Sequence, residues 1–241
     1  MDNFPSTLDH IFIWAFGIII PFLMGLQSDR LSDQIVFDSR SRIKLYIANS
    51  IMLAIAGSSI LLLWLATKRN AKTLGFTEIN NKYSAVVLII IILFFLIYLI
   101  DVLYNYKSIK QKSSTPEWIK KYSFLPHKNK EIPSYLLLCA CAGIFEEIIY
   151  RGFMVTYFMP TISNEFPWLA ISVPAFLFSM AHYYQGWTAV VKIMVFSILF
   201  NVIFIYSGSI YPSMIIHFLI DLLSGMFYMN QLKKTIVDQN Q

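Results

Sequence analysis

The chain alternates between long apolar runs and short polar segments, a pattern typical of a protein that crosses a membrane several times. A helix of about 20 apolar residues spans the hydrocarbon core of a bilayer. Seven runs approach that length, at residues 10–26, 45–66, 83–104, 133–158, 167–182, 187–206 and 209–229. The pattern predicts an all-α, polytopic transmembrane helical bundle of about seven membrane helices, with room for an eighth. The fifth run is short and contains Pro174, and the fourth carries charges, so we expect both to be kinked, tilted or enclosed by other helices.

Composition supports the membrane interpretation. Hydrophobic residues make up 57% of the chain and charged residues 14%, whereas a soluble globular protein carries about 25% charged residues. Lys and Arg outnumber Asp and Glu by 19 to 14, but the bases stand between the apolar runs and do not form a stripe on one folded surface. That distribution is typical of membrane topology and not of a nucleic-acid footprint. We therefore expect the lipid bilayer as a partner and no nucleic acid.

The loop charges also predict an orientation. When the loops are assigned alternately to the two sides of the membrane, the side that holds the C-terminal tail collects most of the Lys and Arg residues. By the positive-inside rule this tail is cytoplasmic.

Within the basic loop at 105–132, Thr115 and Pro116 resemble a helix start followed by aromatic and lysine residues. This segment is either a short interfacial helix or an ordinary linker. Cys139 and Cys141 lie in an apolar run and are expected to be small hydrophobic side chains.

The fourth run carries ionisable groups that are costly in a membrane. Glu146, Glu147 and Arg151 lie within six residues, and a charge at the centre of a membrane helix costs about 2.5–3.5 kcal/mol on insertion scales. Glu147 and Arg151 are four residues apart, so they share a helical face and can pair. Glu146 lies about 100° around the helix and is left to face another helix, where it is a candidate general base.

Two histidines lie in the later runs with polar or aromatic residues one turn away. His182 follows Phe178 by four residues, and His217 precedes Asp221 by four. A membrane histidine often serves only as a hydrogen bond between helices. Ionisable groups on three separate polar-bearing helices, however, favour a functional site.

These motifs carry a resemblance to a known family. The pattern EExxxR at Glu146, Glu147 and Arg151, then FxxxH ending at His182, then HxxxD from His217 to Asp221, resembles the CPBP intramembrane proteases. That family includes the CAAX prenyl endopeptidases and the Abi proteins linked to bacteriocin processing and immunity. The resemblance covers about residues 133–229 and implies a CAAX-protease-like catalytic core.

The resemblance implies a role for each residue. Glu146 and His182 would activate the attacking water, and His217 with Asp221 would stabilise or orient the oxyanion. Glu147 and Arg151 would support them. The prenyl-protease branch resembles Asn at the position of Asp221, and an ionised Asp cannot donate a hydrogen bond to an oxyanion. Asp221 must then be protonated, orient His217 or bind a metal.

Other features of the site stay open at this stage. Asn201 in the sixth run either reaches the site or holds a neighbouring helix. Two histidines and two carboxylates suit a divalent metal such as zinc, with Glu146, His182 and His217 as the candidate ligands. A Glu–His pair that activates water without metal fits the same residues. No organic cofactor is expected.

The sequence therefore predicts three parts: N-terminal membrane helices with a basic cytoplasmic loop at 1–132, a catalytic membrane domain at 133–229 and a polar tail at 230–241. The expected activity is endopeptidase cleavage of a membrane-associated or amphipathic peptide or protein substrate, at a bacterial plasma membrane, in peptide maturation or bacteriocin-related processing or immunity. The rival functions are a transporter or proton relay and a non-catalytic membrane scaffold or immunity protein.

Overall fold

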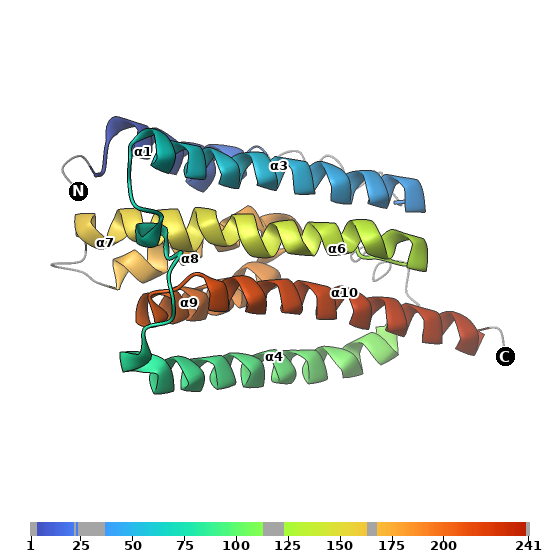
Figure 1. Cartoon of the computed structure of the whole chain (residues 1–241). Helices are drawn as coiled ribbons and strands as arrows, with labels where there is room; N and C mark the ends of the chain where they lie inside the picture. Colours follow the sequence, from blue (N-terminus) through green and yellow to red (C-terminus); the bar gives the residue numbers. More distant parts are fainter. Residues whose placement is uncertain (1–3, 22, 24–36, 113–122, 163–167, 240–241) are drawn as a thin grey trace.

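The chain folds as a bundle of long helices that run side by side (Figure 1). The computed structural model describes residues 4–21, 23, 37–112, 123–162 and 168–239, and within them there is no strand. The main helices are α1 (Thr7–Trp14), α3 (Ser39–Ala66), α4 (Ser84–Lys112), α6 (Ile132–Cys141), α7 (Thr156–Ile162), α8 (Leu169–Ala181), α9 (Trp187–Ser207) and α10 (Tyr211–Gln239). The all-helical prediction is confirmed.

Five of the predicted runs form helices long and apolar enough to cross a membrane within the described residues. These spans are Ser39–Ala66, Asn81–Tyr104, Asn129–Met159, Trp187–Ser207 and Tyr211–Gln231. The first and fifth runs give the shorter apolar helices Thr7–Ile19 and Trp168–Ala181. The protein is thus a multi-pass membrane protein, in which the Pro174-containing helix is short as expected.

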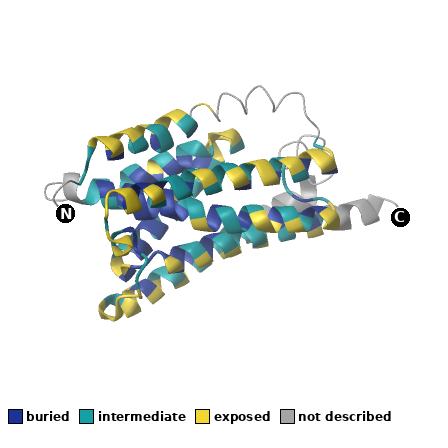
Figure 2. Cartoon of the chain, turned by 45° about the horizontal axis from the view of Figure 1, so that its top comes forward, coloured by how far each residue is buried: buried dark blue, intermediate teal, exposed yellow. Residues whose placement is uncertain are grey.

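The fourth span occupies the middle of the bundle. Figure 1 shows α6 and α7 in one row, with α3 on one side and α10 on the other. Two π-helical stretches, η5 (Ala142–Glu146) and η6 (Ile148–Val155), connect α6 to α7. Every residue from 147 to 155 is buried, in agreement with the dark centre of Figure 2. The charged span is therefore enclosed by protein, as the sequence predicts.

Close helix contact at Gly143 aligns this central span with α10. A Cβ at Gly143 would lie 3.0 Å from the Met214 carbonyl oxygen and 3.0 Å from the Phe218 backbone nitrogen. Only a residue without a side chain allows the two backbones to approach this closely. The contact brings the turn that holds Glu146 opposite the turn that holds His217.

A peripheral helix and two buried ion pairs complete the bundle. Helix α4 packs on α9. Only 11% of its most apolar stretch is buried, so most of that stretch faces outward. Arg69 binds Asp9 through both carboxylate oxygens and lies over the Phe4 and Trp64 rings. At a second point, the buried Arg42 pairs with Glu131 and thereby ties the start of α3 to the segment before α6.

The structure describes only part of the basic loop at 105–132. Most of the possible interfacial helix from Thr115 falls at residues 113–122, which lie outside the described residues. Residues 123–125 form a turn and bend.

The two cysteines are unpaired, and Cys139 is buried among Tyr46 and Tyr135.

Candidate active site

The acidic turn of the central span contributes two carboxylates with different surroundings. Glu147 is completely buried, whereas the Glu146 side chain keeps 15% of its exposure. Glu146 ends the first π-helical stretch and Glu147 lies between the two, and such winding often occurs at functional sites. The wider winding does not separate Glu147 from the residue four positions later.

Glu147 and Arg151 form the ion pair that their spacing predicts. Arg151 Nη1 donates to Glu147 Oε1 at 2.8 Å, and neither side chain is exposed. Arg151 Nη2 donates to the buried Ser197 Oγ at 2.9 Å. The guanidinium carbon lies 4.6 Å from the Phe178 ring centroid and 4.9 Å from that of Phe200. Arg151 is thus held by a carboxylate, a hydroxyl and two aromatic rings.

His217 joins the central span to α10. Its Nδ1 lies 2.7 Å from Glu147 Oε1, and because an ionised carboxylate only accepts, Nδ1 is the donor. Its Nε2 lies 3.6 Å from Glu146 Oε2 and 3.6 Å from Asp221 Oδ2. The imidazole therefore has one nitrogen fixed by a buried carboxylate and the other facing two partly exposed carboxylates.

The bond between His217 Nδ1 and Glu147 fixes the orientation of the imidazole ring. Glu147, expected to support the catalytic residues, contacts His217 itself. The side chains of Glu146 and Asp221, which face the other ring nitrogen, are 15% and 37% exposed. The exposed part of the cluster therefore lies on the Nε2 side of the ring.

His182 lies at the end of α8 with its ring against Phe178. The ring centroids are 4.7 Å apart, and Nδ1 lies 2.9 Å from the Phe178 carbonyl oxygen. A carbonyl oxygen can only accept, so Nδ1 carries the proton and Nε2 has a lone pair. Among the described residues no hydrogen bond or ion pair joins His182 to Glu146. His182 interacts electrostatically with Asp221 and His217.

Helix α9 adds residues that the motifs do not include. Ser197 binds Arg151, and the Phe200 ring stacks on His217 at 5.7 Å between centroids. Asn201, one residue further, donates to the Ile171 carbonyl at 2.7 Å and is fully buried. That bond links α9 to α8 and so favours the helix-holding alternative for Asn201. Serine and phenylalanine are common in membrane helices, so their types alone gave no signal.

The donor chemistry suits a metal, but the candidate ligands are not already gathered into one group among the described residues. Two histidines and two carboxylates are suitable ligands for zinc. Within the part of the chain that the structure describes, however, no three His, Cys, Asp or Glu side chains are grouped so that they could hold a metal ion. His217 Nε2 lies 3.6 Å from the carboxylates of Glu146 and Asp221, but these three side chains are not arranged as a set of metal ligands.

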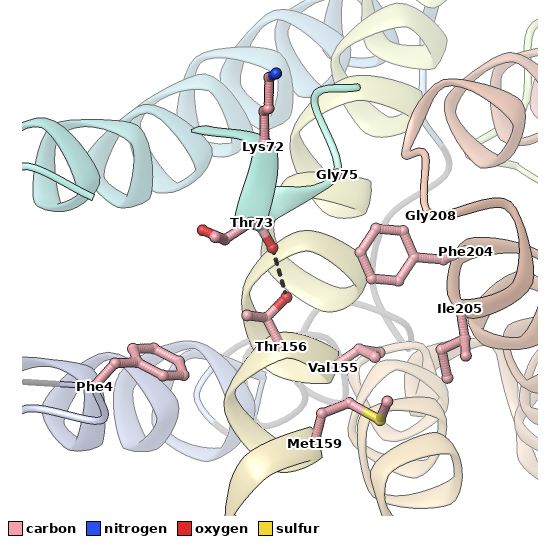
Figure 3. A pocket seen from close by; sticks show the side chains of 10 residues that line it. All are labelled: Phe4, Lys72, Thr73, Gly75, Val155, Thr156, Met159, Phe204, Ile205 and Gly208. Atoms are coloured by element: carbon pink, nitrogen blue, oxygen red, sulfur yellow. Dashed lines mark hydrogen bonds between the residues drawn. The ribbon is translucent and has the colours of Figure 1, made fainter. Parts of the chain in front are cut away.

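A cavity lies apart from these residues. It has a volume of about 670 Å³ and is lined by Phe4, Lys72, Thr73, Gly75, Val155, Thr156, Met159, Phe204, Ile205 and Gly208. Figure 3 shows the hydrogen bond across its wall, from the Thr156 hydroxyl to the Thr73 carbonyl oxygen. No residue of the His217 cluster lines it.

Comparison with known families agrees with this geometry. The model of a family described as "Type II CAAX prenyl endopeptidase Rce1-like" matches residues 128–223. This region, about two fifths of the chain, is similar to the Rce1-like CAAX prenyl endopeptidases. No curated protein and no solved structure matches the chain significantly.

The Rce1-like region runs from the segment before α6 into α10. It contains Glu146, His182, His217 and Asp221, together with the supporting Glu147, Arg151 and Asn201. The peripheral helix α4 and the N-terminal helices lie outside the match. The residues that surround His217 therefore lie within the matched region.

Proposed function

We propose that the protein is an intramembrane endopeptidase that hydrolyses a peptide bond of a membrane-associated or amphipathic peptide. The observation that carries the proposal is the His217 cluster, in which one imidazole nitrogen is bound by Glu147 and the other faces Glu146 and Asp221 at 3.6 Å. Peptide hydrolysis needs a base for water and a donor near the developing oxyanion. This cluster has groups for both tasks inside an apolar bundle.

In the proposed reaction, Glu146 takes one proton from the attacking water. The Nε2 lone pair of His182 accepts the other water hydrogen in a hydrogen bond, because Nδ1 is engaged by Phe178. The water oxygen bonds to the carbonyl carbon, and the carbonyl electron pair moves onto its oxygen. When the tetrahedral intermediate collapses, the C–N bond breaks and the leaving amine takes the proton from Glu146.

His217 and Asp221 act on the oxyanion side. The Nε2 nitrogen of His217, when protonated, donates toward the oxyanion, while Nδ1 stays bound to Glu147. Asp221 Oδ2 lies 3.6 Å from the same Nε2 in the resting site, within ion-pair distance of a protonated His217. Arg151 neutralises Glu147 and keeps it oriented.

We place this activity in bacterial peptide maturation or in bacteriocin-related processing or immunity, with a cytoplasmic C-terminus. The support is the abundance of Ile, Asn and Lys in the sequence and the basic loops on one side. The Rce1-like match supports a peptide or protein substrate in a membrane.

The decisive experiment compares new peptide termini in cells that express the wild type, Glu146→Gln or Glu78→Gln at equal membrane levels. Glu146→Gln keeps the side-chain size but removes the base, so termini that vanish only in this variant identify both the activity and its substrate. Glu78 is exposed in a loop and serves as the matched control. Unchanged termini in Glu146→Gln, with substrate accumulating in vesicles, would instead establish the transporter function.

A divalent metal such as zinc, held by Glu146, His182 and His217, is the second version of the same proposal. The mechanism above routes no step through it. Purified protein treated with a chelator and assayed on the identified substrate separates the two versions. Activity that survives chelation supports the Glu–His mechanism, and activity that is lost and restored by zinc supports the metalloprotease.

A further inference from the structure

The four candidate catalytic residues leave the oxyanion short of hydrogen-bond donors. Ionised Glu146 and Asp221 can only accept hydrogen bonds. The Nδ1 proton of His182 is taken by the Phe178 carbonyl. That leaves His217 Nε2 as the one donor among them, whereas oxyanion sites commonly present more than one donor.

Tyr184 lies where a second donor is needed. It belongs to the short turn η7 (Tyr183–Gln185), two residues after His182. Its ring stacks on the His182 ring, with centroids 6.1 Å apart and an interplanar angle of 28°. Its other aromatic neighbour is Phe124, at 6.4 Å. Tyr184 therefore lies against one face of the His182 ring, beside the proposed water-binding residue.

The hydroxyl group of Tyr184 is set up to donate. Gln185 Nε2 donates to this hydroxyl oxygen at 3.0 Å, so the phenol acts as acceptor there and its own proton is free for another partner. Desolvation, with contributions from the carboxylates of Glu146 and Asp221, raises the pKa of Tyr184 to about 12. The phenol accordingly keeps its proton at neutral pH.

We propose that Tyr184 is an oxyanion donor of this protease and takes the role that Asp221 cannot fill. As water bonds to the carbonyl carbon, the Tyr184 O–H donates a hydrogen bond to the carbonyl oxygen, which gains the electron pair of the broken π bond. No proton moves from tyrosine. The proton from water stays on Glu146 until the amine leaves. This inference rests on the proposed function and adds a donor to it.

The test uses two single-atom changes, Tyr184→Phe and Tyr183→Phe, in the full-length purified protein with the substrate identified above. Loss of one oxyanion donor lowers kcat by about 10²-fold, whereas KM changes little because the bond forms mainly in the transition state. Tyr183 packs edge-on against Trp187, at 5.1 Å, and is the matched control. We expect it to keep wild-type kcat and KM.

Each result has a distinct meaning. A kcat of Tyr184→Phe within about threefold of wild type, where the expected loss is far larger, would overturn the assignment of Tyr184. So would an equal fall in both variants, or a fall caused by higher KM alone. A matching thermal unfolding temperature verifies that Tyr184→Phe is folded, and Tyr184→Leu shows what loss of the ring adds. If Glu146→Gln cleaves normally, Glu146 is not the base; if the wild type produces no new termini, the protease proposal itself fails.

Discussion

Arg151→Met tests whether the buried ion pair holds the site together. The substitution keeps an unbranched side chain of similar length in the slot between Phe178 and Phe200 but removes the charge. Glu147 then loses its cation and keeps the Nδ1–H of His217. The Ser197 hydroxyl loses its donor. The expected result is a folded but markedly less stable protein.

The size of the effect follows from burial. Both partners are fully buried, and removing one partner of such a pair costs about 3–5 kcal/mol because the other charge is stranded. A change of about 1.4 kcal/mol is tenfold in an equilibrium constant, so the folded-to-unfolded ratio falls by at least about a hundredfold. For a chain of this size the melting temperature falls by roughly 2–4 °C per kcal/mol, or about 6–20 °C in total.

The assay is thermal unfolding of purified protein in detergent, followed by circular dichroism. Glu147→Gln provides the reciprocal change, and Glu78→Gln, in an exposed loop, is the control and keeps the wild-type melting temperature. In the double variant neither member of this pair carries a charge. Its loss of stability is therefore smaller than the sum of the two single losses.

Two outcomes would refute this reasoning. One is a wild-type melting temperature for Arg151→Met and Glu147→Gln. The other is strict additivity in the double variant, which would mean that the two charges do not stabilise each other in the folded protein.

The remaining predictions concern neighbouring contacts. Ser197→Ala removes the hydroxyl that binds Arg151 and costs about 1.5–3 kcal/mol; chemical unfolding measures it, and a stability equal to wild type contradicts the role. Gly143→Ala pushes the Glu146 turn away from α10, because its Cβ would meet the Met214 and Phe218 backbone at 3.0 Å; kcat falls while the membrane level holds, and unchanged kcat would show that the spacing is not critical. Asp9→Asn removes the carboxylate that binds Arg69, so we expect faster limited proteolysis near the N-terminus. An unchanged cleavage rate would show that this ion pair does not hold the N-terminal helix in place.

Local spacing predicts the parts of the site that lie on one helix. The pairing of Glu147 with Arg151 and the common face of His217 and Asp221 both follow from a separation of four residues. The apolar runs likewise predict the helices, because burial of backbone polar groups in lipid permits few other structures.

Contacts between helices could not be predicted in the same way. Glu147 and His217 are 70 positions apart, and their bond depends on how closely α10 approaches at Gly143. The π-helical winding of η5 and η6 has no signature in the residue types. Ser197 became a site residue only because α9 packs where Arg151 points.

The basic residues that were used to predict orientation are not all free charges. Arg42 is paired with Glu131 and Arg69 with Asp9. One of these bases belongs to each predicted side of the membrane, so the excess on the C-terminal side is unchanged. A count of Lys and Arg residues in the sequence could not distinguish these paired side chains from the other loop charges.

The ion pair within the central span also bears on how the protein is made. Glu147 and Arg151 belong to one turn of one helix, so they can neutralise each other before any other helix is present. Two separate charges would each oppose entry into the bilayer. The span can therefore leave the insertion machinery as a nearly neutral segment. His217, which arrives 70 residues later, then docks on a carboxylate already in place, and the site is completed only when the last helix is inserted.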